Sequence, residues 1–153
     1  MQRTEQRFRF KILALLFLLL SGSCKKLEES VPYAPIDVYI NIGLPSYQRL
    51  ITATGGIYYN EFNYSIGYRD RGIIVLNKNG FEFTAYDRTC PYQVNDSCNL
   101  LWVIPNTLTV IDSCCGSKFN LLDGSVMNGP ATKALKAYNT SFSGASNVLY
   151  IFN

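Results

Sequence analysis

The chain has 153 residues and a formal net charge of +3, and it contains no histidine. Residues 1–23 carry four basic side chains and one acidic side chain, which account for all of that charge, so the rest of the chain is neutral. A neutral domain lacks the excess positive charge that binds the phosphates of nucleic acid, so we expect no nucleic-acid partner. Because the chain has neither a nucleophile–histidine pair nor a phosphate-binding glycine loop, we expect that it is not an enzyme.

The first 23 residues are typical of a signal peptide. A basic start precedes the apolar run 12–20 and the small residues 21–23, and Cys24 follows directly. The apolar run is shorter than the roughly twenty residues that a membrane-spanning helix needs, so a cleaved signal helix is expected. A cysteine after small residues resembles the lipidation site of bacterial lipoproteins. This resemblance implies a lipidated Cys24 and a location in the bacterial cell envelope; the alternative is an ordinary secretory signal.

The chain after the signal divides into a tether and one domain. Residues 24–34 are expected to hold the lipidated cysteine and a short polar tether, with the membrane as partner through the lipid. Residues 35–153 have the length of one ordinary domain and can bury an adequate core.

The first half of this domain has the alternation and turn signals of β-structure. Apolar and polar residues alternate over 37–44 and 81–86, and the apolar run 72–76 is typical of a buried strand. Residues 77–80 end in glycine and predict a turn that joins two of these strands into a hairpin.

The second half continues in the same way. Further strands are expected at 108–111, 118–121 and 147–152, with a turn at 123–124. No helix of useful length is expected after the signal, and residues 131–137 are the one segment that could form a turn or two. Many short strands with frequent turns predict an all-β fold, an antiparallel β-sandwich or small barrel.

The apolar run 100–105, LLWVIP, has two interpretations. We favour a buried strand or loop plug. An exposed patch there would instead indicate binding to an envelope protein partner.

Four cysteines follow the signal and the lipidation position: Cys90, Cys98, Cys114 and Cys115. An even number in an exported chain indicates disulfides, and spacing cannot choose among the three possible pairings. Structural zinc sites usually have cysteine pairs separated by two to four residues. Here one pair is eight positions apart and the other is adjacent, so the spacing signal for zinc is weak.

The residues around these cysteines form a longer pattern over 72–153. It consists of YDRTCPY at 86–92, Cys98, DSCCGSKF at 112–119, DGSV at 123–126 and GPA at 129–131. This pattern resembles Rieske iron–sulfur domains, most of all the Rieske-like lipoproteins of Bacteroidetes-type bacteria. The resemblance implies an all-β fold in which two loops at one end, here 88–99 and 112–119, hold a 2Fe–2S cluster.

The resemblance also assigns positions to the site residues. In the family, one cysteine and one histidine from each loop bind the two irons, and the second cysteine of each loop forms a disulfide. The cluster-ligand positions are held here by Cys90, Tyr92, Asp112 and Cys115, and the disulfide positions by Cys98 and Cys114. Because the chain has no histidine, we expect that no such cluster assembles and that the protein carries no cofactor; the alternatives are a 2Fe–2S cluster or a single metal ion.

The altered ligand positions suggest two alternatives. A second disulfide could join Cys90 to Cys115, for which their Cα atoms must lie about 4.4–6.8 Å apart. A single zinc or iron ion could instead be bound by Cys90, Cys115 and Asp112, with the Tyr92 phenolate as a fourth ligand. The oxidising setting of an exported protein favours the disulfide.

Two functions are therefore expected. The first is a membrane-anchored, disulfide-stabilised binding or structural module without catalytic activity. The alternative is a redox or metal-binding protein of the Rieske family, active in electron transfer through Cys90 and Cys115.

Overall fold

A computed structural model describes residues 31–51, 56–59 and 66–153. The expected signal peptide, Cys24 and tether residues 25–30 lie outside this part. Val31 and Ala34 are buried, so apolar packing begins inside the segment expected to be tether. Across the described ranges no helix combines the length and the apolar character needed to cross a membrane.

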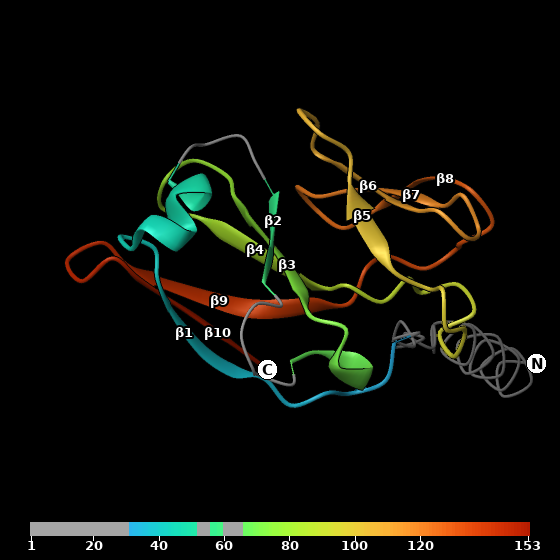
Figure 1. Cartoon of the computed structure of the whole chain (residues 1–153), viewed down its shortest axis with the longest axis horizontal. Coiled ribbons are helices and arrows are strands. Elements are labelled where there is room, and N and C mark those ends of the chain that lie inside the picture. The colour runs from blue at the N-terminus through green and yellow to red at the C-terminus, as the bar shows by residue number, and fades with distance from the viewer. Residues whose placement is uncertain (1–30, 52–55, 60–65) are drawn as a thin grey trace, which may run out of the picture.

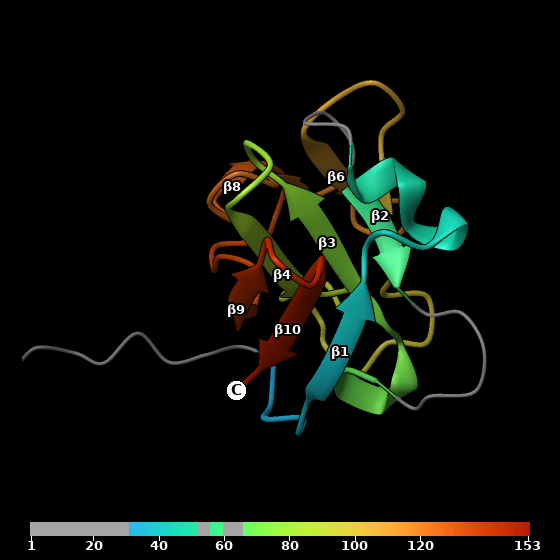
Figure 2. The ribbon, with the colours of Figure 1, turned by 90° about the vertical axis from the view of Figure 1, so that its left-hand side faces the viewer.

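The larger part of the fold is a six-stranded sheet (Figure 1). Its strands, in spatial order, are β1 (Asp37–Asn41), β10 (Val148–Phe152), β9 (Ala137–Ser143), β4 (Phe83–Asp87), β3 (Ile73–Asn77) and β2 (Gly56–Tyr59). Every neighbouring pair is antiparallel. Figure 2 shows β1, β10, β9, β4 and β3 side by side.

The second sheet has four antiparallel strands in chain order. They are β5 (Leu101–Val103), β6 (Thr109–Asp112), β7 (Lys118–Asn120) and β8 (Val126–Asn128). Two short 3₁₀ helices, η1 (Pro45–Leu50) and η2 (Tyr68–Asp70), are the helical elements of the described residues. The prediction of an all-β, antiparallel fold is confirmed.

Strand β3 divides the core in two. All five of its residues are buried, and successive side chains point to opposite faces of the sheet. Ile73 and Val75 belong to a first core cluster, which is enclosed by β1, β9 and β10. Ile74 and Leu76 belong to a second core cluster, which includes Phe119 and fills the space under β5, β6 and β7. The uninterrupted apolar run 72–76 therefore reflects a strand that is covered on both faces.

The predicted hairpin at 72–86 is confirmed. Strands β3 and β4 pair antiparallel, and Gly80 has φ +91° in the turn between them. The Gly80 amide donates a hydrogen bond of 2.6 Å to the Asn77 side chain, which closes this turn. The strand predicted at 37–44 is shorter than expected and ends at Asn41.

The structure has no helical turn at 131–137, where the sequence allowed one or two. Ala131 and Leu135 are buried in the second core cluster, and Ala137 begins β9, which runs to Ser143. The Leu135 amide donates to the Gly124 carbonyl, and the Lys136 carbonyl accepts from Asp87. A segment this short gains little from helical hydrogen bonds alone, so these tertiary bonds and the apolar burial determine its conformation.

The run 100–105 fits neither of its two interpretations fully. Leu101 is completely buried, whereas the next residue, Trp102, is 47% exposed. The guanidinium of Arg88 lies 4.6 Å from the centre of the Trp102 ring. The apolar run is therefore a short strand with one buried face, and its aromatic residue covers a basic side chain.

Candidate functional site

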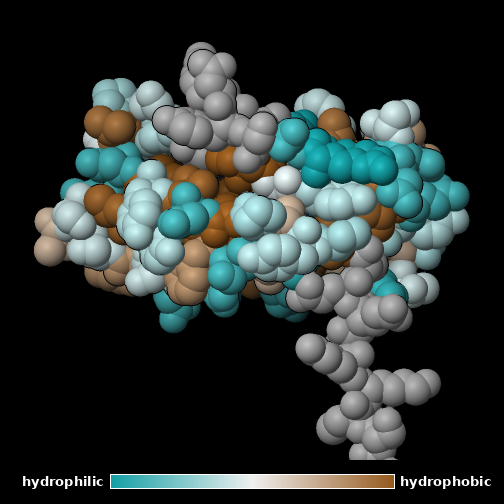
Figure 3. Space-filling view, turned by 90° about the horizontal axis from the view of Figure 1, so that it is seen from below, coloured by the Kyte–Doolittle hydropathy of each residue, from teal (hydrophilic) through white to brown (hydrophobic). Residues whose placement is uncertain are grey.

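The two loops predicted from the sequence meet beside the second sheet. The first loop, 88–99, leads from β4 to β5, and the second, 112–119, leads from β6 to β7. A disulfide joins Cys98 of the first loop to Cys114 of the second, with their Cα atoms 6.2 Å apart. Seen from below, hydrophilic side chains gather toward the end of the molecule that carries these loops (Figure 3).

Asn99 holds the first loop in shape. Its side chain is buried, and its oxygen accepts a 2.6 Å hydrogen bond from the Cys90 amide. Its amide nitrogen donates to the carbonyls of Tyr92 and Gln93, at 2.6 and 2.7 Å. One side chain thus satisfies three backbone groups that a loop without strand partners leaves open. No spacing or motif in the sequence marks this residue, so its role was not predicted.

Asp112 holds the second loop in shape by accepting hydrogen bonds from its backbone. This buried residue ends β6, and its Oδ1 accepts hydrogen bonds from the amides of Cys114 and Cys115, at 2.8 and 3.4 Å. Its backbone also pairs with Ser117 and Gly116, and Gly116 has φ +75°, a conformation that favours glycine. The loop therefore turns tightly around one carboxylate.

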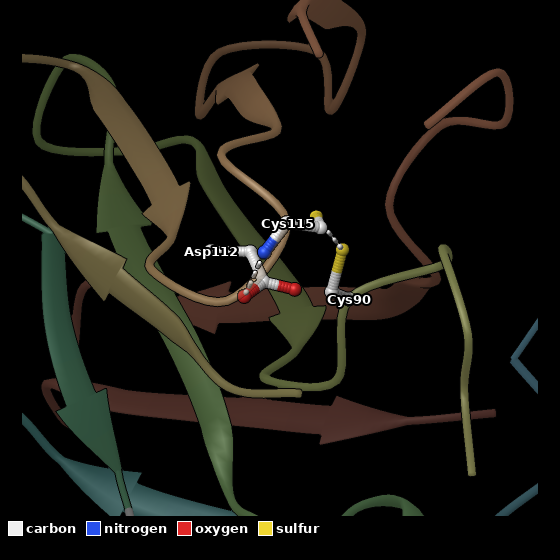
Figure 4. Close-up of side chains that lie close together, drawn as sticks. All are labelled: Cys90, Asp112 and Cys115. Atoms are coloured by element: carbon white, nitrogen blue, oxygen red, sulfur yellow. Dashed lines mark hydrogen bonds between the residues drawn. The ribbon is translucent and has the colours of Figure 1, made fainter. Parts of the chain in front are cut away.

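Three ligand-type side chains converge between the loops (Figure 4). The sulfurs of Cys90 and Cys115 lie 3.9 Å apart, and both lie within 4.8 Å of an Asp112 carboxylate oxygen. Cys90 is completely buried and Cys115 is half-buried. Tyr92, the fourth predicted ligand, packs against the second core cluster, as Cys115 does. The structure thus places Cys90, Asp112 and Cys115 together.

The environment of the two thiols differs. Burial raises the pKa of the Cys90 thiol, a hydrogen bond with the Tyr92 backbone lowers it, and the hydrogen bond and charge of Asp112 raise it again. Cys90 is therefore a neutral thiol at neutral pH when nothing else is bound. The Cys115 thiol donates to the Ser117 hydroxyl at 3.1 Å, and its sulfur accepts from the Ser117 amide at 3.4 Å.

The donor set does not fit a Rieske cluster. That cluster is bound by two thiolates on one iron and by two imidazoles on the other. The chain supplies two thiols and one carboxylate at this place and has no histidine at all. Carboxylate oxygen is a hard ligand and no substitute for imidazole in this chemistry.

A third segment covers the second loop from the side. The Ala131 amide donates a 3.1 Å hydrogen bond to the Ser117 hydroxyl. Gly129 has φ +106°, and a side-chain carbon at this position would lie 2.4 Å from the Ser117 Cα. Only glycine permits this approach.

We expect Gly129→Ala to lower the free energy of unfolding by about 1–3 kcal/mol through backbone strain. The clash of the added carbon with Ser117 increases this loss. Urea denaturation measures this loss. Gly80→Ala is the control, since Gly80 also has a positive φ, of +91°, but no atom lies within 4 Å of an added carbon. Equal losses in the two variants would show that the contact with Ser117 is unimportant.

The Cys98–Cys114 bridge should contribute strongly to stability. It joins residues 16 positions apart, and a loop of about this size is stabilised by roughly 3 kcal/mol when it is closed. We expect the double variant Cys98→Ala/Cys114→Ala to lose about that amount in chemical denaturation without reductant. Addition of reductant to the variant should change little. A loss below about 1 kcal/mol would contradict this account.

Comparisons with known proteins add little to this picture. No family model and no curated protein matches the chain. Among solved structures, the chain is similar to the crystal structure of a putative NADH-dependent nitrite reductase small subunit from Mycobacterium tuberculosis. The identity is 14%, the TM-score is 0.42, and the match covers 77% of this chain and 96% of that one. A match at this level assigns neither a family nor an activity.

Proposed function

We propose that the protein is a lipid-anchored, Rieske-like domain of the bacterial cell envelope that carries no 2Fe–2S cluster. It acts as a binding or structural module without catalytic activity. The donor set between its two loops carries this proposal, because the loops are fastened by Cys98–Cys114 and present two thiols and a carboxylate where the family has two cysteines and two histidines. The sequence pattern over 72–153 supports the family assignment.

The test of this proposal is the iron and acid-labile sulfide content of the full-length chain, produced in a bacterial host and extracted in detergent. We expect neither iron nor sulfide in the protein. We also expect a visible spectrum without iron–sulfur absorption. Stoichiometric iron and sulfide would overturn the proposal and would mean that other ligands replace the missing histidines.

The membrane anchor has its own test. Lipidation of Cys24 should place the protein in the membrane fraction, because several acyl chains at about 0.8 kcal/mol per methylene give stable attachment. We expect Cys24→Ala to abolish lipid labelling and to lower the membrane-bound share. Unchanged lipid labelling in this variant would refute lipidation at Cys24. Cys90→Ala is the control and should be lipidated like the original chain.

A second candidate function is dithiol–disulfide exchange at Cys90 and Cys115. The two thiols face each other with their sulfurs 3.9 Å apart, and a bond forms when the sulfurs approach to about 2.05 Å. Oxidation would remove two electrons and two protons from the pair, and an exported thiol–disulfide protein would accept them. A Cys90–Cys115 bridge that is reduced while Cys98–Cys114 persists would support this function.

A further inference from the structure

We propose that Cys90, Asp112 and Cys115 form a binding site for a single Zn²⁺ ion, with two thiolate ligands, one carboxylate ligand and a fourth position open to water or a partner's donor atom. The inference rests on the proposed function in one respect, namely that no iron–sulfur cluster occupies the loops.

The separation of the sulfurs matches zinc better than a disulfide. Tetrahedral zinc with Zn–S bonds of about 2.3 Å places two sulfurs about 3.8 Å apart. The sulfurs of Cys90 and Cys115 are 3.9 Å apart. A disulfide needs about 2.05 Å, so the two sulfurs would have to approach each other by almost half of their separation.

The third ligand lies close to the two sulfurs. A carboxylate oxygen bound to the same zinc would lie about 3.6 Å from each sulfur. In the structure an Asp112 oxygen lies within 4.8 Å of both sulfurs, so the three donor atoms would draw closer together around an ion. Figure 4 shows one Asp112 oxygen directed toward Cys90 while the other faces the loop backbone.

The surroundings hold these ligands in place. Asp112 Oδ1 accepts from the amides of Cys114 and Cys115, which fixes the carboxylate and leaves its second oxygen available. The Ser117 amide donates to the Cys115 sulfur, and such a bond stabilises a thiolate. The Cys98–Cys114 bridge fixes the distance between the two loops. In metal sites, groups that hydrogen-bond to the ligands orient those ligands toward the ion.

The charges of the site also suit a divalent cation. On binding, the two thiols release two protons, and the Zn²⁺ charge is then balanced by two thiolates and one carboxylate, which leaves a net charge of −1. Asp112 is buried, and the amides of Cys114 and Cys115 that donate to its side chain are neutral groups. Cys115 is half-buried, so this ligand is partly accessible to solvent.

The experiment is a Zn²⁺ titration of the full-length chain in detergent, without oxygen, against a chromophoric chelator. It is paired with alkylation and mass spectrometry of the cysteines. We expect one equivalent of zinc and zinc-dependent protection of the half-buried Cys115 from alkylation. Cys115→Ser and Asp112→Asn should weaken binding by more than the roughly 10–100-fold that a lost outer-shell partner costs.

Asp112→Asn is the sharper variant, because asparagine keeps one oxygen that can accept from the two loop amides. It replaces the other oxygen and the negative charge by an NH2 group that cannot bind the ion. Asp96→Asn is its matched control, since Asp96 is an exposed carboxylate of the first loop outside the three-residue group. The control should bind zinc like the original chain.

Three outcomes would overturn the inference: no zinc binding, equal zinc affinity in Asp112→Asn and Asp96→Asn, or isolation of the chain with a Cys90–Cys115 disulfide that excludes the ion. In each case a chain free of iron and sulfide leaves the proposed function intact. Iron with labile sulfide would overturn both, so the two failures are distinguishable.

Discussion

Phe119→Ala is expected to lower the free energy of unfolding by about 3–5 kcal/mol, the usual cost of removing a buried aromatic side chain. Phe119 lies in the middle of β7, is completely buried, and belongs to the second core cluster. On either side in the sheet it pairs with Val110 and Val126. Truncation leaves a cavity directly under the strand that follows the second site loop.

Chemical denaturation measures this loss, and Phe81→Ala is the matched control. Phe81 is the same residue type but is 79% exposed in the β3–β4 turn, so its truncation should change stability by no more than about 0.5 kcal/mol. Similar losses for the two variants would mean that the second core cluster does not stabilise the fold. Phe119→Leu should fall between the two, because leucine fills part of the cavity.

Asp87→Ala should also cost about 3–5 kcal/mol. The Asp87 side chain is completely buried and accepts from the Tyr68 amide at 2.6 Å, the Thr89 amide at 2.8 Å and the Tyr138 hydroxyl at 2.7 Å. Alanine would leave all three donors without this partner, and each unsatisfied buried donor costs about 1–3 kcal/mol. Because these donors belong to η2, the first site loop and β9, one carboxylate fastens three segments.

The measurement is a double-mutant cycle of Asp87→Ala with Tyr138→Phe. If the Tyr138 hydroxyl donates to the Asp87 carboxylate, Tyr138→Phe should lower the free energy of unfolding of the wild-type chain. The same substitution should lower it much less in the Asp87→Ala background. Strict additivity of the two losses would contradict the bond. A loss of less than about 1 kcal/mol for Asp87→Ala alone would contradict the wider role.

The strands that the sequence predicted are those with a regular pattern. β3 has an uninterrupted apolar run and β4 alternates apolar and polar residues, and both strands are buried on both faces. β9 was missed because its exposed face carries Asn139, Ser141 and Ser143, and because the preceding residues favour helix. Residues 131–136 are fixed by hydrogen bonds to distant segments, which no local pattern records.

The site was predictable only in part. Its cysteine spacing left three disulfide pairings open, and the resemblance to a family was needed to select Cys98–Cys114 and to group Cys90, Asp112 and Cys115. The role of Asn99 could not be predicted, because its bonds depend on how the loop folds back on itself. Nor does the sequence indicate the close approach of Gly129 to Ser117, which is a contact between loops.

The pairing of the first strand with the last has a consequence for the order of folding. β1 lies between solvent and β10, and the Ile36 amide donates to the Asn153 side chain across a sequence separation of 117. The β3–β4 hairpin and the β5–β8 meander need only nearby residues, so they can form while the chain is still being synthesised. The edge of the large sheet can form only after β10 has been synthesised. Until then the backbone groups of β1 that pair with β10 are not hydrogen-bonded to that strand.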